Sequence, residues 1–395
     1  MTHVIRPAAV AAALLAMLAG CAAPPQREPA REPGGPTTEA IANATYRAGL
    51  LQGTPVTLRD GRYERGDGVV VWLLPAPVAR GLVAGKPSAV VLIAESGGGS
   101  GTFISLALVQ DVDGRAVEVA STLLGDRPRV QGLALGADGL ITVDLVQVGP
   151  SDAFCCPTMP MSVDYAFEGG RLVVRGLSSA EIDARGYAEG VNAFVVQPTA
   201  YDRSLPPSGQ GEPKHFAWTF DGDQAVDTAR GHVAVYPLAA YRAIWREAGD
   251  GFVERQLAAL TRLLDSREAS PAVPLPVLPQ RGGFNDLAAQ VRYLELPGGG
   301  RGVRFVGRFS QDAAPLLNRQ LRYVFQGLSA DGETLFVTDL PVSATGVPEA
   351  VEETGPDIVA YLARWRATLE GLSGDDFSPG LAALDALVTS VEVNR

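Results

Sequence analysis

Histidine, cysteine and lysine are scarce in this chain of 395 residues, and their scarcity limits the chemistry available to it. The sequence contains three histidines and three cysteines. We expect His3 to be removed with an N-terminal leader, so a histidine base or a histidine-rich metal site would depend on His215 or His232. The sequence also has no complete catalytic or cofactor-binding motif. These gaps favour a protein that is not an enzyme, and we expect no cofactor.

Positive charge is also in short supply, because the formal net charge is −11. A negative chain does not suit nucleic acid, which attracts basic surfaces, and we expect no nucleic-acid partner. No apolar run after the leader reaches the roughly 20 residues that a membrane-spanning helix needs. With 46% hydrophobic and 19% charged residues, the composition is that of an ordinary globular protein. The length of the body favours two domains.

The first residues have the pattern of an export signal. His3 and Arg6 give a weakly basic start, and the apolar run from Ala8 to Ala19 is too short to cross a bilayer. The run ends in Leu18-Ala19-Gly20-Cys21, which resembles the lipobox of bacterial lipoproteins. The resemblance implies that residues 1–20 are a cleaved signal peptide.

The same resemblance implies that the thiol of Cys21 is acylated, so that the lipid bilayer is a partner. Ala22 in the second mature position implies, by the sorting rules of that class, the outer membrane of a diderm host. Residues 21–38 then form a proline-rich tether. Such linkers extend by about 3 Å per residue, so the tether would hold the body roughly 20–50 Å from the membrane. We therefore expect an exported protein that is anchored to the cell envelope.

Residues 39–178 have the pattern of a β-rich domain, an antiparallel meander that forms a sandwich or a barrel-like stack. Strand-like runs alternate with turn signals, and three hairpins are predicted. Their turns are at Asp113-Gly114, at residues 136–139 and at Glu168-Gly169-Gly170. A break in the pattern near residues 177–180 marks the predicted domain boundary.

Residues 179–395 have the pattern of an α+β domain, an antiparallel sheet with packed helices. Short strands are predicted at 193–196, 216–220 and 232–236, and two hairpins at 291–309 and 321–340. A helical region at 238–267 is interrupted at 249–251, and its apolar stripe comprises Val253, Leu257, Leu260 and Leu264. Residues 271–283 form an irregular proline-rich connection. A helix at 357–372 would have Pro356 in its first turn, and the last helix would start at Ser378-Pro379.

Several passages resemble uncharacterised envelope lipoproteins that pair a β-rich module with an α+β module. The passages are SGGGSGTFISLALV, LLGDRPRVQGLAL, CCPTMP, RGVRFVGRFSQ and LRYVFQGLSADG. The order of elements in the C-terminal part also resembles the α/β/α sandwich of photosystem-II accessory proteins. Neither resemblance implies an activity.

The segment Cys155-Cys156-Pro157-Thr158-Met159-Pro160-Met161 groups two thiols and two thioethers. Soft ligands of this kind suit Cu(I), which makes copper the one conceivable cofactor. A redox-active bond between Cys155 and Cys156 is a second interpretation, and it would be strained because adjacent cysteines lie closer than the usual disulfide range. A structural turn is favoured over both, because exported proteins tend to oxidise exposed thiols.

Other candidate sites are weaker. His215 could pair with Asp221 or Asp223, but no activated nucleophile accompanies it, and a surface or satisfied histidine is favoured. The glycine-rich residues 95–102 match neither a phosphate loop nor a nucleophile elbow, and a connection between two strands is favoured. Six aromatic residues of the second domain are expected in its core, although they could line a groove for an apolar ligand: Tyr293, Phe305, Phe309, Tyr323, Phe325 and Phe336.

The preferred hypothesis is a membrane-anchored envelope lipoprotein that binds an unidentified protein or small molecule and is not an enzyme. One alternative is a thiol redox or hydrolytic enzyme that uses Cys155 and Cys156, or His215. Another is a copper-handling protein that uses Cys155, Cys156, Met159 and Met161.

Overall fold

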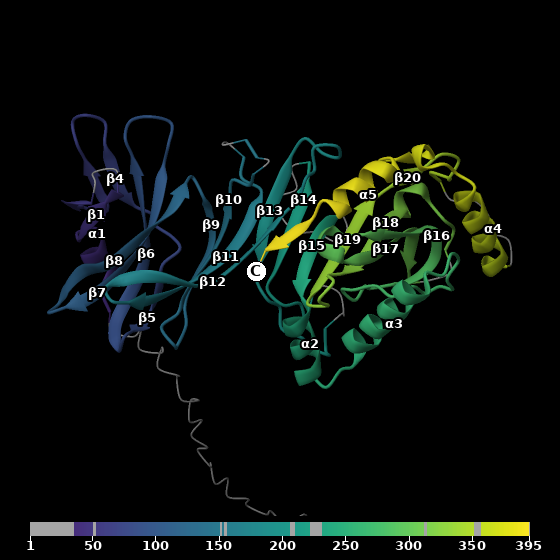
Figure 1. The fold of residues 1–395 in the computed structure, drawn as a ribbon, viewed down its shortest axis with the longest axis horizontal. Coiled ribbons are helices and arrows are strands. Elements are labelled where there is room, and N and C mark those ends of the chain that lie inside the picture. Colours follow the sequence, from purple (N-terminus) through teal and green to yellow (C-terminus); the bar gives the residue numbers. More distant parts are fainter. Residues whose placement is uncertain are drawn as a thin grey trace, which may run out of the picture.

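Antiparallel sheets dominate this protein. The computed structural model describes residues 35–49, 53–150, 152–153, 156–205, 210–221, 231–311, 314–350 and 357–394. Every strand pairing among these residues is antiparallel, and helices form a minor part (Figure 1). The predicted antiparallel β-rich fold is confirmed to that extent.

Two of the sheets near the N-terminus pack face to face. The first contains β3 (Arg62–Glu64), β4 (Val70–Leu73), β5 (Ala79–Val83), β6 (Lys86–Ser96), β7 (Phe103–Val112) and β8 (Arg115–Asp126). The second has the order β22-β12-β11-β10-β9, with β9 (Arg129–Leu135), β10 (Ile141–Gln147), β11 (Met159–Glu168), β12 (Arg171–Glu181) and β22 (Glu392–Asn394). A smaller layer of α1 (Thr38–Ala42), β1 (Thr45–Ala48) and β2 (Thr54–Thr57) covers the outer face of the first sheet.

Strand β6 shows why this part of the sequence is continuously apolar. Its residues alternate between two cores, so Val90, Leu92 and Ala94 face the second sheet. Val91 and Ile93 face the layer formed by α1, β1 and β2. A strand that is buried on both faces needs no polar alternation, and residues 89–94 are accordingly all buried.

The three predicted hairpins are confirmed. At the β7–β8 turn, Asp113 and Gly114 both have positive φ, 52° and 77°, as tight hairpin turns require. The carboxylate of Asp111 accepts the N–H of Gly114 at 2.8 Å, so Asp111 stabilises the turn. β9 pairs with β10, and β11 pairs with β12, across the other two turns.

The predicted break at residues 177–180 lies inside a strand. β12 runs to Glu181, and its last three residues pair with β22, so that Ser179 faces Asn394 in the register. Figure 1 shows this pairing as the yellow arrow next to the C-terminus, beside β12. The local sequence around residues 177–180 does not indicate this pairing of β12 with β22, because the partner strand lies more than 200 residues away in the sequence.

A seven-stranded sheet forms the rest of the body, in the order β13-β14-β15-β19-β18-β17-β16. Its strands are β13 (Val191–Val196), β14 (His215–Phe220), β15 (His232–Pro237), β16 (Phe284–Glu295), β17 (Arg301–Ser310), β18 (Arg322–Leu328) and β19 (Thr334–Pro341). The predicted strands and hairpins of this region are confirmed, and the hairpins extend further than predicted.

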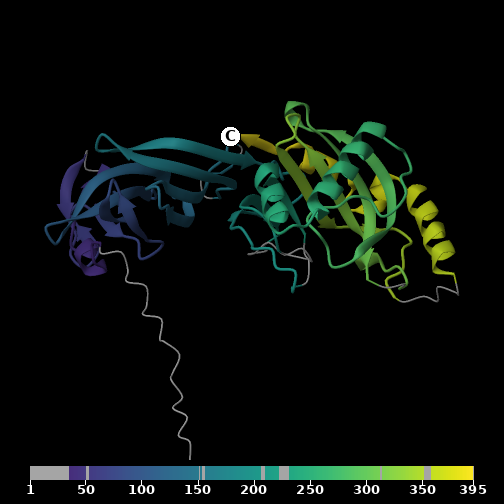
Figure 2. The ribbon, with the colours of Figure 1, turned by 90° about the horizontal axis from the view of Figure 1, so that it is seen from below.

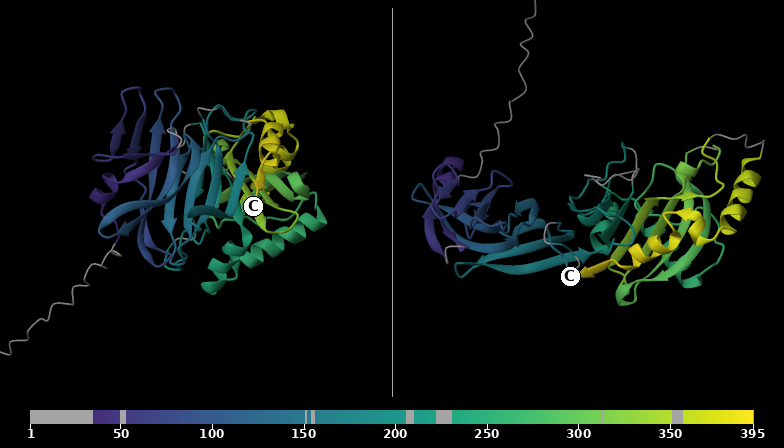
Figure 3. Two further views of the ribbon diagram at one scale, coloured as in Figure 1. Left: turned by 60° about the vertical axis from the view of Figure 1, so that its left-hand side comes forward. Right: turned by 90° about the horizontal axis from the view of Figure 1, so that it is seen from above.

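Helices cover both faces of this sheet (Figures 2 and 3). α2 (Leu238–Glu247), α3 (Phe252–Ser266) and the proline-rich segment pack on one face. α4 (Ile358–Glu370) and α5 (Leu381–Thr389) pack on the other. The predicted stripe of α3 is buried in the first of these cores, at Val253, Leu257, Leu260 and Leu264.

The predicted aromatic residues belong to these two cores. Phe305 is buried against the α2–α3 layer, whereas Tyr323, Phe325 and Phe336 are buried on the opposite face. Tyr293 and Phe309 are half-buried at the α2–α3 layer. The core interpretation of these side chains is confirmed.

The starts of the last two helices differ from the prediction. Asp357 is the N-cap of α4, because its carboxylate accepts the N–H of Ala360 at 3.0 Å. Pro356, which lies outside the described residues, therefore precedes the cap. α5 begins after Gly380, whereas Ser378 lies in β21 (Phe377–Ser378), which pairs with β20 (Ser343–Ala344). Ser378, which was predicted to cap the helix, is instead part of a strand that pairs with β20. Within the described residues, no helix has the length and apolar character needed to span a membrane.

Candidate functional site

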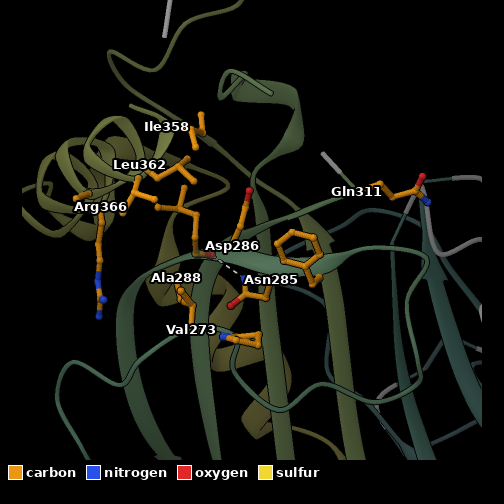
Figure 4. A pocket seen from close by; sticks show the side chains of 13 residues that line it. Val273, Asn285, Asp286, Ala288, Gln311, Ile358, Leu362 and Arg366 are labelled. Carbon is orange, nitrogen blue, oxygen red and sulfur yellow. Dashed lines mark hydrogen bonds between the residues drawn. The ribbon is translucent and has the colours of Figure 1, made fainter. Parts of the chain in front are cut away.

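An open apolar groove of about 690 Å³ lies between α4 and the edge strand β16 (Figure 4). One wall is the exposed side of the first half of α4, and the other is the start of β16 with the proline-rich segment that precedes it. The volume lies within the range of about 300–1,000 Å³ that is typical of small-molecule sites. The lining residues are Val273, Pro274, Phe284, Asn285, Asp286, Leu287, Ala288, Gln311, Ile358, Val359, Leu362, Ala363 and Arg366.

α4 is tied to the body near both of its ends, and the groove lies beside the helix between it and β16. Tyr361 in its first turn is buried, and its hydroxyl accepts the N–H of Leu316 at 3.2 Å. The register of β16 shifts between Ala289 and Arg292, and Gln290 there has a left-handed φ of 57°. Its side-chain amide donates to the carbonyls of Leu369 and Leu372, at 2.9 and 2.8 Å, and these bonds tie the last turn of α4 to β16.

Exposed apolar side chains mark the rim. Val359 on α4 is 75% exposed and Phe284 at the start of β16 is 56% exposed. Apolar side chains that gather at the rim of an apolar groove are typical of binding surfaces. The groove therefore combines a concave apolar shape with an exposed apolar rim.

The polar floor of the groove is already satisfied within the protein. The carboxylate of Asp286 pairs with the guanidinium of Arg308, which is fully buried and also donates to the carbonyl of Ala314 at 2.8 Å. The amide of Asn285 donates to the carbonyls of Leu287 and Arg308. The floor therefore supplies shape but few free polar groups.

Arg366 sits at the end of the groove near the proline-rich segment. Its Nη2 donates to the hydroxyl of Ser270 at 2.7 Å and to the carbonyl of Pro271 at 3.2 Å. Both acceptors are neutral. Among the described residues no acid pairs with Arg366, while the other charged lining residue, Asp286, is already neutralised by Arg308. This end of the groove therefore carries a positive charge.

The two candidate histidines are buried elsewhere, on the α2–α3 side of the sheet. The ring of His215 stacks on Tyr236 with centroids 4.2 Å apart, and its Nδ1 lies 2.8 Å from the carbonyl of Pro213. Burial lowers the pKa of His215 to about 4 and that of His232 to about 3. Both imidazoles are therefore neutral at ordinary pH.

The proposed pairing of His215 with Asp221 is wrong. His215 begins β14 and Asp221 follows its end, so the two residues lie at opposite ends of one strand. Asp223 lies outside the described residues. The nearest acid is instead Glu212, whose Oε2 is 3.8 Å from Nε2 of His215 and whose pKa is raised by burial.

A group of buried charged side chains lies next to the histidines. Asp339, which faces His232 across β15 and β19, pairs with both Arg281 and Arg322. Burial lowers the pKa of Arg281 to about 10, and the charge of Arg322 nearby acts in the same direction. Asp339 is fully buried, so its ion pairs stabilise the fold rather than present a reactive surface.

The segment around Cys156 is held in place by many polar contacts. Asp152 accepts the N–H groups of Gly149 and Thr158, at 2.8 and 2.7 Å. The carbonyl of Thr158 accepts the indole N–H of Trp218 at 3.0 Å, and that of Pro157 accepts Arg129. These bonds are those of a structural turn.

The predicted soft-ligand cluster is divided among different surroundings. Cys156 is exposed and disulfide-bonded, whereas Met161 is half-buried against the core between the two facing sheets. Met159 is half-buried at the start of β11. Cys155, like Cys21, lies outside the described residues. Within the described part, no group of three or more histidine, cysteine, aspartate or glutamate side chains is arranged to hold a metal ion.

A polar cluster joins β14 to the five-stranded sheet. The ammonium of Lys214 lies 3.1 Å from the carboxylate of Asp144 and 2.8 Å from the hydroxyl of Ser162. Ser162 donates to the same carboxylate at 2.7 Å, and Gln197 donates to its second oxygen. Asp144 and Ser162 belong to the five-stranded sheet, whereas Lys214 directly precedes β14. The cluster therefore fastens the two sheets together.

The glycine-rich residues 95–102 connect β6 to β7, as predicted. Comparison of the chain with family models, curated proteins and solved structures found no match. Function therefore has to be argued from the site itself.

Sequence reasoning missed the groove. The helix at 357–372 was predicted, and its side chains Ile358, Leu362, Trp365 and Leu369 pack against the core. Val359 and Ala363 are apolar positions beside those four residues, and this wider apolar surface was the available signal. The contribution of Phe284 to the groove could not be predicted from the sequence, because the exposure of a strand's first residue depends on tertiary structure.

Proposed function

We propose that this protein is an exported, lipid-anchored envelope protein whose body binds an apolar ligand in the groove between α4 and β16. The observation that carries the proposal is the combination of an open apolar volume of about 690 Å³ with exposed Val359 and Phe284 at its rim. A binding role that is not enzymatic agrees with this site, whose polar floor is already paired within the protein.

The anchor is proposed on Cys21 and the preceding Leu18-Ala19-Gly20. Several acyl chains on one residue anchor a protein stably, whereas a single chain binds marginally. The proline-rich stretch between Cys21 and the first described residue, 35, would then separate the body from the membrane surface, in the outer membrane if the host is diderm.

We further propose two modules within the body, with the boundary near residue 178. Its support is that the core between the two facing sheets and the cores of the seven-stranded sheet consist of separate sets of residues. β22 and the Lys214–Asp144 pair would then act as ties between the modules.

A thiol redox role is the second candidate, and the observation that favours it is the exposed, disulfide-bonded Cys156. Copper handling has less support, because a thiol in a disulfide is not a copper ligand. Mass spectrometry of the native protein before and after reduction separates the two. A gain of two hydrogens at Cys155–Cys156 agrees with the redox candidate or with a structural turn, and bound copper with two free thiols supports copper handling.

The groove is tested by titrating the full-length protein with N-phenyl-1-naphthylamine, an uncharged probe that fluoresces in apolar surroundings. Ala363→Trp places an indole in the groove and is expected to weaken binding at least about tenfold, a free-energy loss of about 1.4 kcal/mol. Ala367→Trp is the matched control, because Ala367 is exposed on the same helix and does not line the groove. Equal binding by both variants would refute the proposed site.

A further inference from the structure

We infer that the ligand of the α4–β16 groove is a long-chain carboxylate, a fatty acid anion, whose head group lies at Arg366. This inference rests on the function proposed above and adds to it the chemical class of the ligand.

The walls of the groove suit an alkyl chain. Most of the side chains that line it are aliphatic or aromatic, among them Val273, Phe284, Leu287, Ile358 and Leu362. A ligand with buried hydroxyl or amide groups would lose its hydrogen bonds to water there without replacing them. An alkyl chain has no such groups to satisfy.

A peptide is a poorer match for the same reason. The amide of Asn285 and the carboxylate of Asp286 are engaged by Leu287, by Arg308 and by the N–H of Leu275. A bound peptide backbone needs partners for each N–H and C=O group. The groove floor has few to offer.

One end of the groove has a cation with free donors. Both described bonds of Arg366 are made by Nη2, so Nε and Nη1 have no partner among the described residues. A guanidinium prefers a carboxylate or phosphate to neutral acceptors. A single arginine at the end of an apolar groove therefore favours a ligand with one negative charge at the end of its chain. The net charge of −11 on the protein disfavours ligands of higher negative charge.

The inference is tested by displacement of bound N-phenyl-1-naphthylamine from the full-length protein. We expect dodecanoate to displace the probe at a concentration about fivefold lower than 1-dodecanol, which has the same chain without the charge. Arg366→Gln removes the charge and keeps a polar side chain at this position. It should abolish the preference for dodecanoate over 1-dodecanol.

Arg364→Gln is the matched control, because Arg364 lies on the same helix, over the ring of Tyr361, and does not line the groove. It should keep the preference for dodecanoate. If the probe binds but dodecanoate has no advantage over dodecanol, the carboxylate inference fails while the proposed groove stands. If a lysophospholipid of the same chain length displaces the probe better than dodecanoate, the fatty acid is the wrong class. If the probe does not bind at all, the proposed function itself fails.

Discussion

At the scale of single residues, the protein buries an unusual number of ionisable side chains on the α2–α3 face of its large sheet. His215, His232 and Glu212 lie close to Arg281 and to the ion pair of Arg322 with Asp339. Neutral buried histidines make the free energy of unfolding depend on pH, because they can be protonated in the unfolded chain but not in the folded protein.

We predict that stability falls as the pH drops from 7 toward 4. The folded pKa values of His215 and His232, about 4 and about 3, lie below the ordinary value of 6.5. Below pH 6.5 the unfolded state therefore binds more protons than the folded state. Each histidine contributes about 2 kcal/mol of loss between pH 7 and pH 5. Glu212 acts in the opposite direction, because burial raises its folded pKa.

Urea unfolding at pH 7 and pH 5 measures this loss in the wild type and in His215→Asn. The variant should lose less stability than the wild type over this interval, because one of the two responsible groups is gone. An identical loss in both proteins would show that His215 does not supply the effect.

A second prediction at this scale concerns the groove floor. Asp286→Asn removes the charge that balances the fully buried Arg308, so we expect about 3–5 kcal/mol of destabilisation in urea unfolding at pH 7. The double variant Asp286→Leu/Arg308→Met leaves no buried charge and should recover much of that stability. A double variant that is less stable than Asp286→Asn would contradict this account.

At the scale of elements, α4 is attached to the body near both of its ends. Its buried residues are Tyr361 and Leu369, whereas Ile358, Leu362 and Trp365 are only half-buried. The hydroxyl of Tyr361 accepts the N–H of Leu316 in the first turn. The amide of Gln290 fixes the last turn to β16.

We predict that Gln290→Gly loosens α4 without unfolding the protein. Glycine adopts the left-handed φ of 57° freely, which offsets part of the roughly 2 kcal/mol that the two lost bonds cost. Hydrogen exchange of α4 should become faster, whereas exchange of α5 should not change. Unchanged protection of α4 would mean that the Gln290 amide does not hold the helix.

Some secondary-structure elements of this protein could be predicted from the sequence, and others could not. Asp113-Gly114 and the stripe of α3 specify their own local structure, so the hairpin and the helix were predicted within a few residues. Ser378 and residues 177–180 were misassigned because distant strands, β20 and β22, determine their conformation. The groove was missed for a related reason, since it depends on how far α4 stands from β16 rather than on the pattern of either element.

At the scale of the whole molecule, the polar cluster around Asp144 joins the five-stranded sheet to β14. Asp144 accepts hydrogen bonds from Ser162, Gln197 and Lys214. The amide of Gln131 adds a second tie, through the carbonyl of Ala193 at 2.9 Å. If the body consists of two modules, these bonds couple their unfolding.

We predict that Asp144→Ala separates two thermal transitions in differential scanning calorimetry. Loss of three hydrogen bonds costs about 1 kcal/mol each and removes the counter-ion of Lys214, so the module that contains Asp144 should unfold first. Asp164→Ala is a control, because the hydroxyl of Thr142, which bonds Asp164 at 2.6 Å, belongs to the same five-stranded sheet. A single transition in Asp144→Ala would count against the two-module layout.

The most direct test of the central claim is to locate a bound apolar ligand. The full-length protein is irradiated with an uncharged long-chain alcohol that carries a diazirine in its chain, and the labelled peptides are identified by mass spectrometry. The account predicts labelling of residues 273–288 and 358–366, competed by excess N-phenyl-1-naphthylamine and lost in Ala363→Trp but not in Ala367→Trp. Labelling that falls elsewhere, or that Ala363→Trp leaves unchanged, would contradict the claim that this groove is the binding site.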